Sequence, residues 1–350
     1  MGTLLLHVDF LQRLPKEEEA TKFIRISKSS TAALRSVENV DLDQEAPKIC
    51  MDFDENLLQV PSAVKVSVFE GFARQNISEE EMDPKAEILG FLHTRYGLPL
   101  TQTKELFLSD TSTSLFTKLV LACVEENGTL IFPMGSSGTF VSVTMFLEAN
   151  FKRLPTKASN SFKATAGELA TFLEGVEKPW LYLAGPTVNP TGQIYTNAEI
   201  NEILDVRKSH GARVILDTSY SGLEYGGQSE SWDLKQAVVQ ESSSTYAIAI
   251  LVGFSAGLMT GGLEFGFAAV ADPIFTEVFK DAPTMSRPHG TLKYTIKKLL
   301  GMLDQKSEVL LTGVEQQKKT LKHRAQELCK VINMCACTCF PQCSKFQNHS

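Results

Sequence analysis

The sequence predicts an α/β fold in which helices cover both faces of a mostly parallel sheet. Three observations lead to this prediction. Short apolar segments without a polar face alternate with amphipathic segments from about residue 83 onward. Polar residues gather directly after several of the apolar segments, where ligands bind in such sheets. The 350 residues, 43% of them hydrophobic, can bury one large core, or a large domain with a smaller one.

The first half of this fold begins with an amphipathic helix that Gly97 and Pro99 close. The second helix begins at an Asp or Thr cap and ends at Gly128. In chain order, the expected elements are a helix over 84–100, a strand over 103–110, a helix over 111–128, a strand over 129–134, a helix over 138–150 and a strand over 151–156.

The second half continues the alternation, and a polar stretch interrupts it once before the last two strands. In chain order, the expected elements are a helix over 165–177, a strand over 179–186, a helix over 197–211, strands over 212–219, 245–253 and 265–272, and a helix near 289–330.

Composition and charge exclude several classes of function. The formal net charge is -7 and the basic residues are scattered, which argues against nucleic acid as a partner. The longest apolar stretch, 247–254, is too short to span a bilayer, and the N-terminus lacks the regions of a signal peptide. We therefore expect a soluble, cytoplasmic protein with no membrane partner.

The seven cysteines are unevenly placed, and five of them lie between residues 329 and 350. Their Cys-x-Cys spacing is not that of structural zinc sites, so no metal site is predicted. We expect residues 335–350 to form a disordered Cys-rich tail. The charged residues 1–45 are expected to be a leader or linker, and Cys50 and Cys123 to be buried free thiols.

The segment "GPTVNPTGQIY" over 185–195 follows an expected strand. Pro190 and Gly192 favour a tight turn that directs the Asn189 amide above the strand end. Taken alone, the segment fits a plain turn equally well.

The segment "VILDTSYSGLEY" over 214–225 places Asp217 at the end of a buried strand and Tyr220 three residues later. Burying a carboxylate costs several kcal/mol unless a cation or hydrogen-bond donors meet it. A helix cap could satisfy Asp217 as well as a ligand could, so this segment alone is also undecided.

Together, in this order and at this spacing, the two segments resemble aminotransferases of the pyridoxal-phosphate fold type I superfamily. The resemblance implies that Asn189 and Tyr220 contact the phenolic oxygen of pyridoxal phosphate, and that Asp217 pairs with its pyridinium nitrogen. It also implies an aminotransferase large domain over 46–288, the start of a truncated small domain over 289–334, and a homodimer.

The same superfamily uses a Ser-x-Ser-Lys loop followed by Gly-x-Arg-x-Gly. The lysine carries the cofactor covalently and moves the proton, and the arginine binds the phosphate. Aligned with this pattern, "GFSAGLMTGGLEFG" keeps Ser255, Gly262 and Gly266, but has Ala256 at the lysine position and Glu264 at the arginine position. Alanine has no amine, so no catalytic residue is predicted. Replacing Arg by Glu turns an attraction of roughly 3 kcal/mol per unit pair at about 5 Å into repulsion.

Two further positions depart from the superfamily pattern. The phosphate-binding turn reads "SDTSTS", in which Thr111 and Ser112 keep a helix start while Asp110 replaces a glycine. The aromatic residue that stacks on the cofactor ring has no counterpart in "FPMGSSGTF", because Phe140 comes too late. Lys118 and Lys293 lie outside the lysine loop and are not expected to replace its lysine.

A narrower resemblance is to the C-terminal region of the plant methionine S-methyltransferase family, through "LFLSDTSTSLFTKLVLACVEENGTLIFP", "DTSYSGLEY" and "RPHGTLKYTIKKLL". It implies a regulatory or binding module that has lost its cofactor contacts, so that pyridoxal phosphate is implied by resemblance only and is not bound covalently. Its implied partners are a methyltransferase domain or protein and an amino-acid ligand. Two alternatives stay open, namely a pyridoxal-phosphate transaminase or lyase with rerouted chemistry, and a fragment without an independent function.

Overall fold

A computed structural model describes residues 60–74, 78–98, 105–189, 191–224, 248–254, 264–270, 277 and 289–334. The expected leader and Cys-rich tail, and also Ser255, Ala256 and Gly262, lie outside these residues. The chain divides into two units between Asp54 and Glu55, and every described residue belongs to the second unit.

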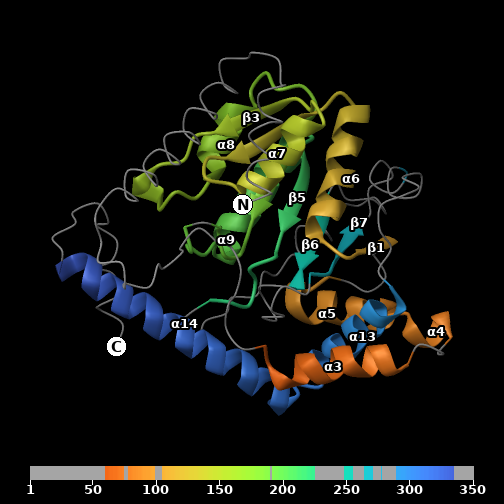
Figure 1. Cartoon of the computed structure of the whole chain (residues 1–350). Coiled ribbons are helices and arrows are strands. Elements are labelled where there is room, and N and C mark those ends of the chain that lie inside the picture. The colour runs from red at the N-terminus through yellow and green to blue at the C-terminus, as the bar shows by residue number, and fades with distance from the viewer. Residues whose placement is uncertain are drawn as a thin grey trace, which may run out of the picture. The chain divides into compact units, whose positions relative to one another are not determined.

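Seven strands of the described part form one sheet in the order β1-β7-β6-β5-β4-β2-β3 (Figure 1). Neighbouring strands from β6 to β3 run parallel, whereas β7 runs antiparallel to both β6 and β1. The strands are β1 (Glu105–Ser109), β2 (Thr129–Pro133), β3 (Phe151–Leu154), β4 (Pro179–Ala184), β5 (Arg213–Asp217), β6 (Ile248–Gly253) and β7 (Gly266–Val270). The predicted mostly parallel, helix-covered sheet is therefore confirmed.

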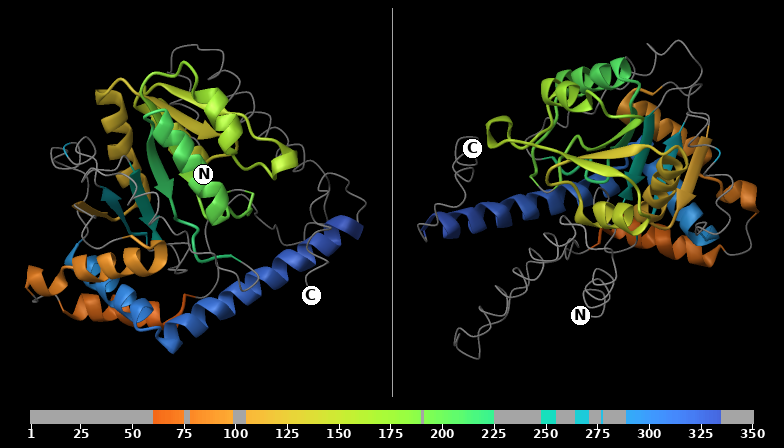
Figure 2. Two further views of the ribbon diagram at one scale, coloured as in Figure 1. Left: turned by 180° about the vertical axis from the view of Figure 1, so that it is seen from behind. Right: turned by 90° about the horizontal axis from the view of Figure 1, so that it is seen from above.

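Helices pack on both faces of this sheet (Figure 2). Side chains that alternate along each strand divide the interior into two cores. One core includes α6 and α7, and the other includes α5, α8, α9 and α13. The helices are α3 (Ser62–Ala73), α4 (Glu79–Met82), α5 (Lys85–Tyr96), α6 (Ser112–Glu125), α7 (Gly138–Phe146), the short 3₁₀ turn η1 (Ala158–Asn160), α8 (Ala166–Leu173), α9 (Asn197–Ser209), α13 (Gly290–Asp304) and α14 (Glu308–Met334).

The predicted helix ends are set by local chemistry. Gly97 follows α5 with a φ of 65°, a left-handed conformation that favours glycine. The Thr111 hydroxyl accepts the Ser114 N–H at 3.0 Å and caps α6. The same helix ends at Glu125, before the predicted Gly128, and Asn127 takes the left-handed conformation with a φ of 55°. Gly128 is small for a packing reason, since a Cβ there would lie 2.7 Å from Nε1 of Trp180.

Two helical features differ from the pattern read in the sequence. Helix α3 lies in a segment to which no element was assigned, and it packs closely on α13, where a Cβ at Gly71 would be 2.7 Å from the Thr291 carbonyl oxygen. The helix expected near 289–330 is two helices, because the chain turns at Lys306 with a φ of 52°. The assignment of these helices to a small domain stays a prediction.

Candidate functional site

The polar residues singled out in the sequence lie at one edge of the sheet. Asp217 ends β5 and pairs in register with Ala184 of β4 and Leu251 of β6. The antiparallel strand β7 starts at the same edge, since Gly266 pairs with Gly253 at the end of β6 and with Ser109 at the end of β1. The carboxyl ends of four strands and the start of a fifth therefore meet there.

Asp217 is buried, with 6% of its surface exposed, and other groups of the same chain satisfy its carboxylate. The Tyr182 hydroxyl donates to Oδ2 at 2.6 Å. The Ser219 hydroxyl and backbone N–H donate to Oδ1 at 2.6 and 3.1 Å. Burial raises the pKa of Asp217 above its ordinary value, and the hydrogen bonds from Ser219 and Tyr182 oppose this rise.

The N-terminus of α6 lies beside this aspartate. A Cβ built at Gly253 would lie 2.9 Å from Oγ of Ser219 and 3.4 Å from Cβ of Ser112. Gly253 is therefore the small residue that lets the start of α6 and the turn after β5 approach the same strand end. The structure thus brings together Ser112 and the turn that begins at Asp217.

The two residues implied to contact a phenolic oxygen lie in separate turns. Asn189 is half-buried in the turn after β4, where the Gly192 N–H donates to the Val188 carbonyl at 2.8 Å. It lines a small crevice together with Met134 at the end of β2. Tyr220 is half-buried in the turn after β5. Asn189 therefore belongs to the β2–β4 side of the edge, and Tyr220 to the Asp217 side.

The loop positions that departed from the superfamily pattern are partly described. Glu264 is exposed just before β7, whereas Ser255 and Ala256 lie outside the described residues. Phe140 stacks on Phe116 in the core, with ring centroids 4.2 Å apart and 5% of Phe140 exposed. Lys118 lies within α6 and Lys293 within α13.

Sequence reasoning missed an ionic group that joins the two motif segments. Glu224 is buried; it accepts hydrogen bonds from the Thr187 hydroxyl and the Gly222 N–H, both at 2.9 Å. Arg95 of α5 lies 3.8 Å from Glu224 and donates to the Ser221 hydroxyl at 3.1 Å. In the sequence, only the carboxylate of Glu224, seven residues after Asp217, could have indicated this ionic group. Arg95 could not, because a polar residue is expected on the exposed side of an amphipathic helix.

Replacing Tyr182 by phenylalanine is expected to lower the free energy of unfolding by about 2 kcal/mol at about pH 8, and by less at about pH 5. The Tyr182 hydroxyl favours the ionised form of Asp217, so its loss raises the pKa of Asp217 further. A raised pKa in the folded state stabilises the fold at low pH, and this stabilisation is lost as the pH rises through that pKa. Urea denaturation followed by circular dichroism at both pH values measures the difference.

Tyr195→Phe is the matched control for this variant. The buried Tyr195 hydroxyl accepts the Ala164 N–H at 2.8 Å, so its loss leaves a backbone donor, and not a carboxylate, unsatisfied. The loss of stability should then be the same at the two pH values. An equally pH-independent loss in Tyr182→Phe would contradict the role assigned to Tyr182.

Neither a membrane span nor a metal centre emerges within the described ranges. None of the helices there is long and apolar enough to cross a bilayer. The same residues contain no group of three or more His, Cys, Asp or Glu side chains that could hold a metal ion.

Comparison with known sequences gives a family and a set of relatives. The family described as aminotransferase class I and II matches residues 70–347. Methionine S-methyltransferase of Hordeum vulgare is 40% identical over 328 residues, which cover 93% of this chain and 30% of that protein. The protein of the same name from Zea mays is 39% identical, with the same coverage. The chain thus spans about a third of the length of the curated relatives that it matches.

Comparison with solved structures agrees on the fold. An aromatic aminotransferase from Pyrococcus horikoshii superposes with a TM-score of 0.66 at 19% identity, covering 81% of this chain and 73% of that one. A pyridoxal-phosphate-bound C-S lyase from Staphylococcus hominis has a TM-score of 0.66 at 16% identity, covering 84% and 71%. Because the family match extends over most of the chain and the sheet has this architecture, the chain belongs to the class I and II aminotransferase family.

Proposed function

We propose that this chain is a non-catalytic aminotransferase-type module that binds a small molecule and regulates or supports a methionine S-methyltransferase-type protein. The observation that carries the proposal is the chemistry at the former cofactor edge. Ala256 stands at the lysine position, Glu264 stands at the position of the phosphate-binding arginine, and Asp110 replaces a glycine of the phosphate-binding turn.

The phosphate end does not fit an anionic cofactor. The register of β1, β6 and β7 places Asp110 and Glu264 at the edge where α6 begins. Two carboxylates there repel a phosphate dianion. The Thr111 hydroxyl also binds the Ser114 N–H, one of the backbone donors that an anion at this helix end would use.

Asp217, the residue implied to pair with the cofactor ring, has its hydrogen bonds satisfied without a ligand. Asp217 accepts three hydrogen bonds from its own chain, and burial raises its pKa. A partner for a pyridinium nitrogen has to be ionised and accessible. The raised pKa of Asp217 disfavours its ionised form, and its burial limits access to it. The retention of Asp217 in the sequence is then explained by its structural role at the end of β5.

The wider context comes from the relatives and stays part of the proposal. In a plant protein of this type, S-methylmethionine is made from methionine and S-adenosylmethionine. The sequence of this chain contains no strand followed by the acidic Gly-x-Gly loop of a methyltransferase. We therefore assign methyl transfer to a separate domain or protein, with which this module associates. The buried free thiol of Cys123 fits the reducing cytoplasm.

The purified chain is expected to form no stoichiometric covalent adduct with pyridoxal phosphate at the strand-end site. With Ala256 at the lysine position and acidic groups at the phosphate end, both covalent capture and phosphate binding are lost. The measurement is a titration followed by visible absorbance, then borohydride reduction and peptide mass spectrometry. A reference aminotransferase treated in parallel serves as the positive control.

A reducible adduct mapped to Lys118 or Lys293 would contradict the proposal and favour an enzyme with rerouted chemistry.

The fragment alternative has its own test, because a module with an independent role should unfold in one cooperative transition at low protein concentration. A broad transition with aggregation would support the fragment alternative.

A further inference from the structure

The long helix α14 is buried against its own domain over its first part only. It packs there on α3 and α13, and Leu310, Val314 and Gln317 are buried. The helix then continues to Met334, away from α3 and α13 (Figure 1). From Lys318 onward, none of the described residues of the helix is buried. The second part of α14 is therefore a surface that the domain itself leaves uncovered within the described residues.

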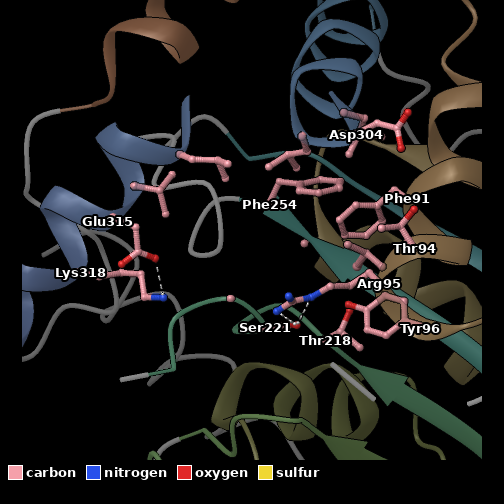
Figure 3. Close-up of a pocket in the computed structure, with 17 residues that line it drawn as sticks. Phe91, Thr94, Arg95, Tyr96, Thr218, Ser221, Phe254, Asp304, Glu315 and Lys318 are labelled. Carbon is pink, nitrogen blue, oxygen red and sulfur yellow. Dashed lines mark hydrogen bonds and ion pairs between the residues drawn. The ribbon is translucent and has the colours of Figure 1, made fainter. Parts of the chain in front are cut away.

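The boundary between the two parts lies at the rim of a cavity of about 380 Å³ at the strand ends (Figure 3). Glu315 and Lys318 form an ion pair there at 3.0 Å, and the Lys318 side chain is only 14% exposed. None of the described residues after Lys318 lines the cavity. The surface that follows on α14 is therefore separate from the cavity and from the strand ends.

The apolar stripe of α14 continues beyond this boundary. Leu321 comes about three helical turns after Leu310, so the two side chains lie on the same face of the helix. Ala325 and Leu328 follow Leu321 at the i+4 and i+7 positions of that face. Leu328 is 42% exposed, and Leu321 and Ala325 are partly exposed. An apolar stripe that begins under the domain and continues into solvent indicates a face that another molecule covers.

Basic side chains occupy the rest of this helix surface. Between residues 319 and 330, four basic residues and one acidic residue give a net charge of +3, in a chain whose net charge is -7. Lys330 pairs with Glu327 at 2.7 Å. The side chains of Lys319, Lys322 and Arg324 make no ion pair or hydrogen bond within the described part of the chain. The charge of this surface therefore favours an acidic partner.

The width of the apolar stripe favours a protein groove over a membrane surface. A helix that lies in a membrane interface has a broad apolar face with bulky residues such as Trp, Phe and Leu. Residues 319–330 contain two leucines and no Trp, Phe or Tyr. In helix-in-groove recognition, by contrast, a single stripe with i, i+4 and i+7 positions enters an apolar groove. Residues 318–334 of α14 extend over about 25 Å, which provides several turns for such a contact.

We propose that the second part of α14 is bound by an acidic protein through an apolar groove of the kind that calcium-loaded EF-hand proteins expose. Leu321 and Leu328 enter the groove, and Lys319, Lys322 and Arg324 pair with carboxylates at its rim. The inference goes beyond the proposed function, because it requires neither a bound small molecule nor the loss of the cofactor contacts.

Isothermal titration of the full chain with calmodulin tests this proposal. Calmodulin is an EF-hand protein whose Met-rich groove opens when calcium binds. With calcium we expect an equimolar complex with a Kd of about 1 μM or lower. With a calcium chelator the groove closes, so binding should weaken by at least about a hundredfold. No binding with calcium, or equal binding with the chelator, would overturn the proposal.

Two variants, each with a matched control, locate the binding. Leu328→Glu should weaken it by at least about tenfold, whereas Phe69→Glu, at a position on α3 that is 73% exposed, should bind like the wild type. Arg324→Glu should weaken binding by about threefold to tenfold, whereas Lys65→Glu, exposed on α3, should not change it. Unchanged binding in Leu328→Glu, with folding verified by circular dichroism, would refute the site, as would equal losses in the two controls.

Sedimentation with vesicles of phosphatidylcholine and phosphatidylserine separates the membrane alternative. We expect the chain to stay in the supernatant. Binding to these vesicles without binding to calmodulin would refute the groove and assign this face to a membrane surface.

The result is separable from the test with pyridoxal phosphate. A cofactor adduct together with calmodulin binding that depends on Leu328 would refute the non-catalytic function and keep this surface. No adduct and no calmodulin binding would refute this surface and leave the loss of cofactor chemistry intact.

Discussion

Replacing Gly266 by alanine is expected to lower the free energy of unfolding by about 3 kcal/mol. A Cβ at Gly266 would lie 2.3 Å from the Val252 carbonyl oxygen and 3.6 Å from Cα of Gly253. Both neighbours are backbone atoms of β6, so no side chain can move aside. The two strands would have to separate inside a sheet whose strands are buried on both faces. Chemical denaturation followed by circular dichroism measures the loss.

Gly301→Ala is the matched control for Gly266→Ala. Gly301 lies within α13, and a Cβ there would meet no atom within 4 Å. Alanine is favoured over glycine inside a helix, so this variant should be neutral or more stable by up to about 1 kcal/mol. If Gly266→Ala proved as stable as Gly301→Ala, the close approach of β6 and β7 described above would be wrong.

Gly266 also explains part of what the family loop retains. Gly266 matches the second glycine of the Gly-x-Arg-x-Gly pattern, in which Glu264 stands at the arginine position of this chain. The structure gives Gly266 a use that needs no cofactor, because it allows β7 to lie against β6. Strand packing therefore accounts for Gly266 without any role in cofactor binding.

Replacing Phe116 by alanine is expected to lower the free energy of unfolding by about 4 kcal/mol. Phe116 of α6 is fully buried; it stacks on Phe140 and meets the ring of Tyr182 edge to face at 5.8 Å. Its removal leaves a cavity between α6, α7 and the sheet, and neighbouring rings can fill that cavity only in part. Thermal and urea denaturation of the variant measure the effect.

The rings of Phe116 and Phe140 also hold Tyr182 in place for its buried hydrogen bond to Asp217. Tyr182 packs against Phe116 and Phe140 while its hydroxyl reaches Asp217. Phe146→Ala, at a position on α7 that is 60% exposed, is the control and should change stability by less than about 0.5 kcal/mol. A similar small change in Phe116→Ala would contradict the packing described here.

Much of the fold could be predicted because it depends on local patterns. Apolar strands and capped helices follow from side-chain periodicity and from residues such as Thr111 and Gly97. The antiparallel place of β7 between β1 and β6 could not be predicted, because strand order depends on contacts between distant segments. The break between α13 and α14 was missed because Lys306, a residue without turn preference, adopts the left-handed conformation.

The sequence by itself determined the family resemblance and the absence of an amine at the Ala256 position, since both depend on residue identity at fixed spacing. Only the tertiary structure decided which groups satisfy Asp217 and where a second cavity lies. Tyr182 reaches Asp217 from 35 positions away, and Arg95 reaches Ser221 from 126 positions away. Burial and hydrogen bonding between such residues depend on how the strands and helices pack, and linear spacing carries no record of that packing.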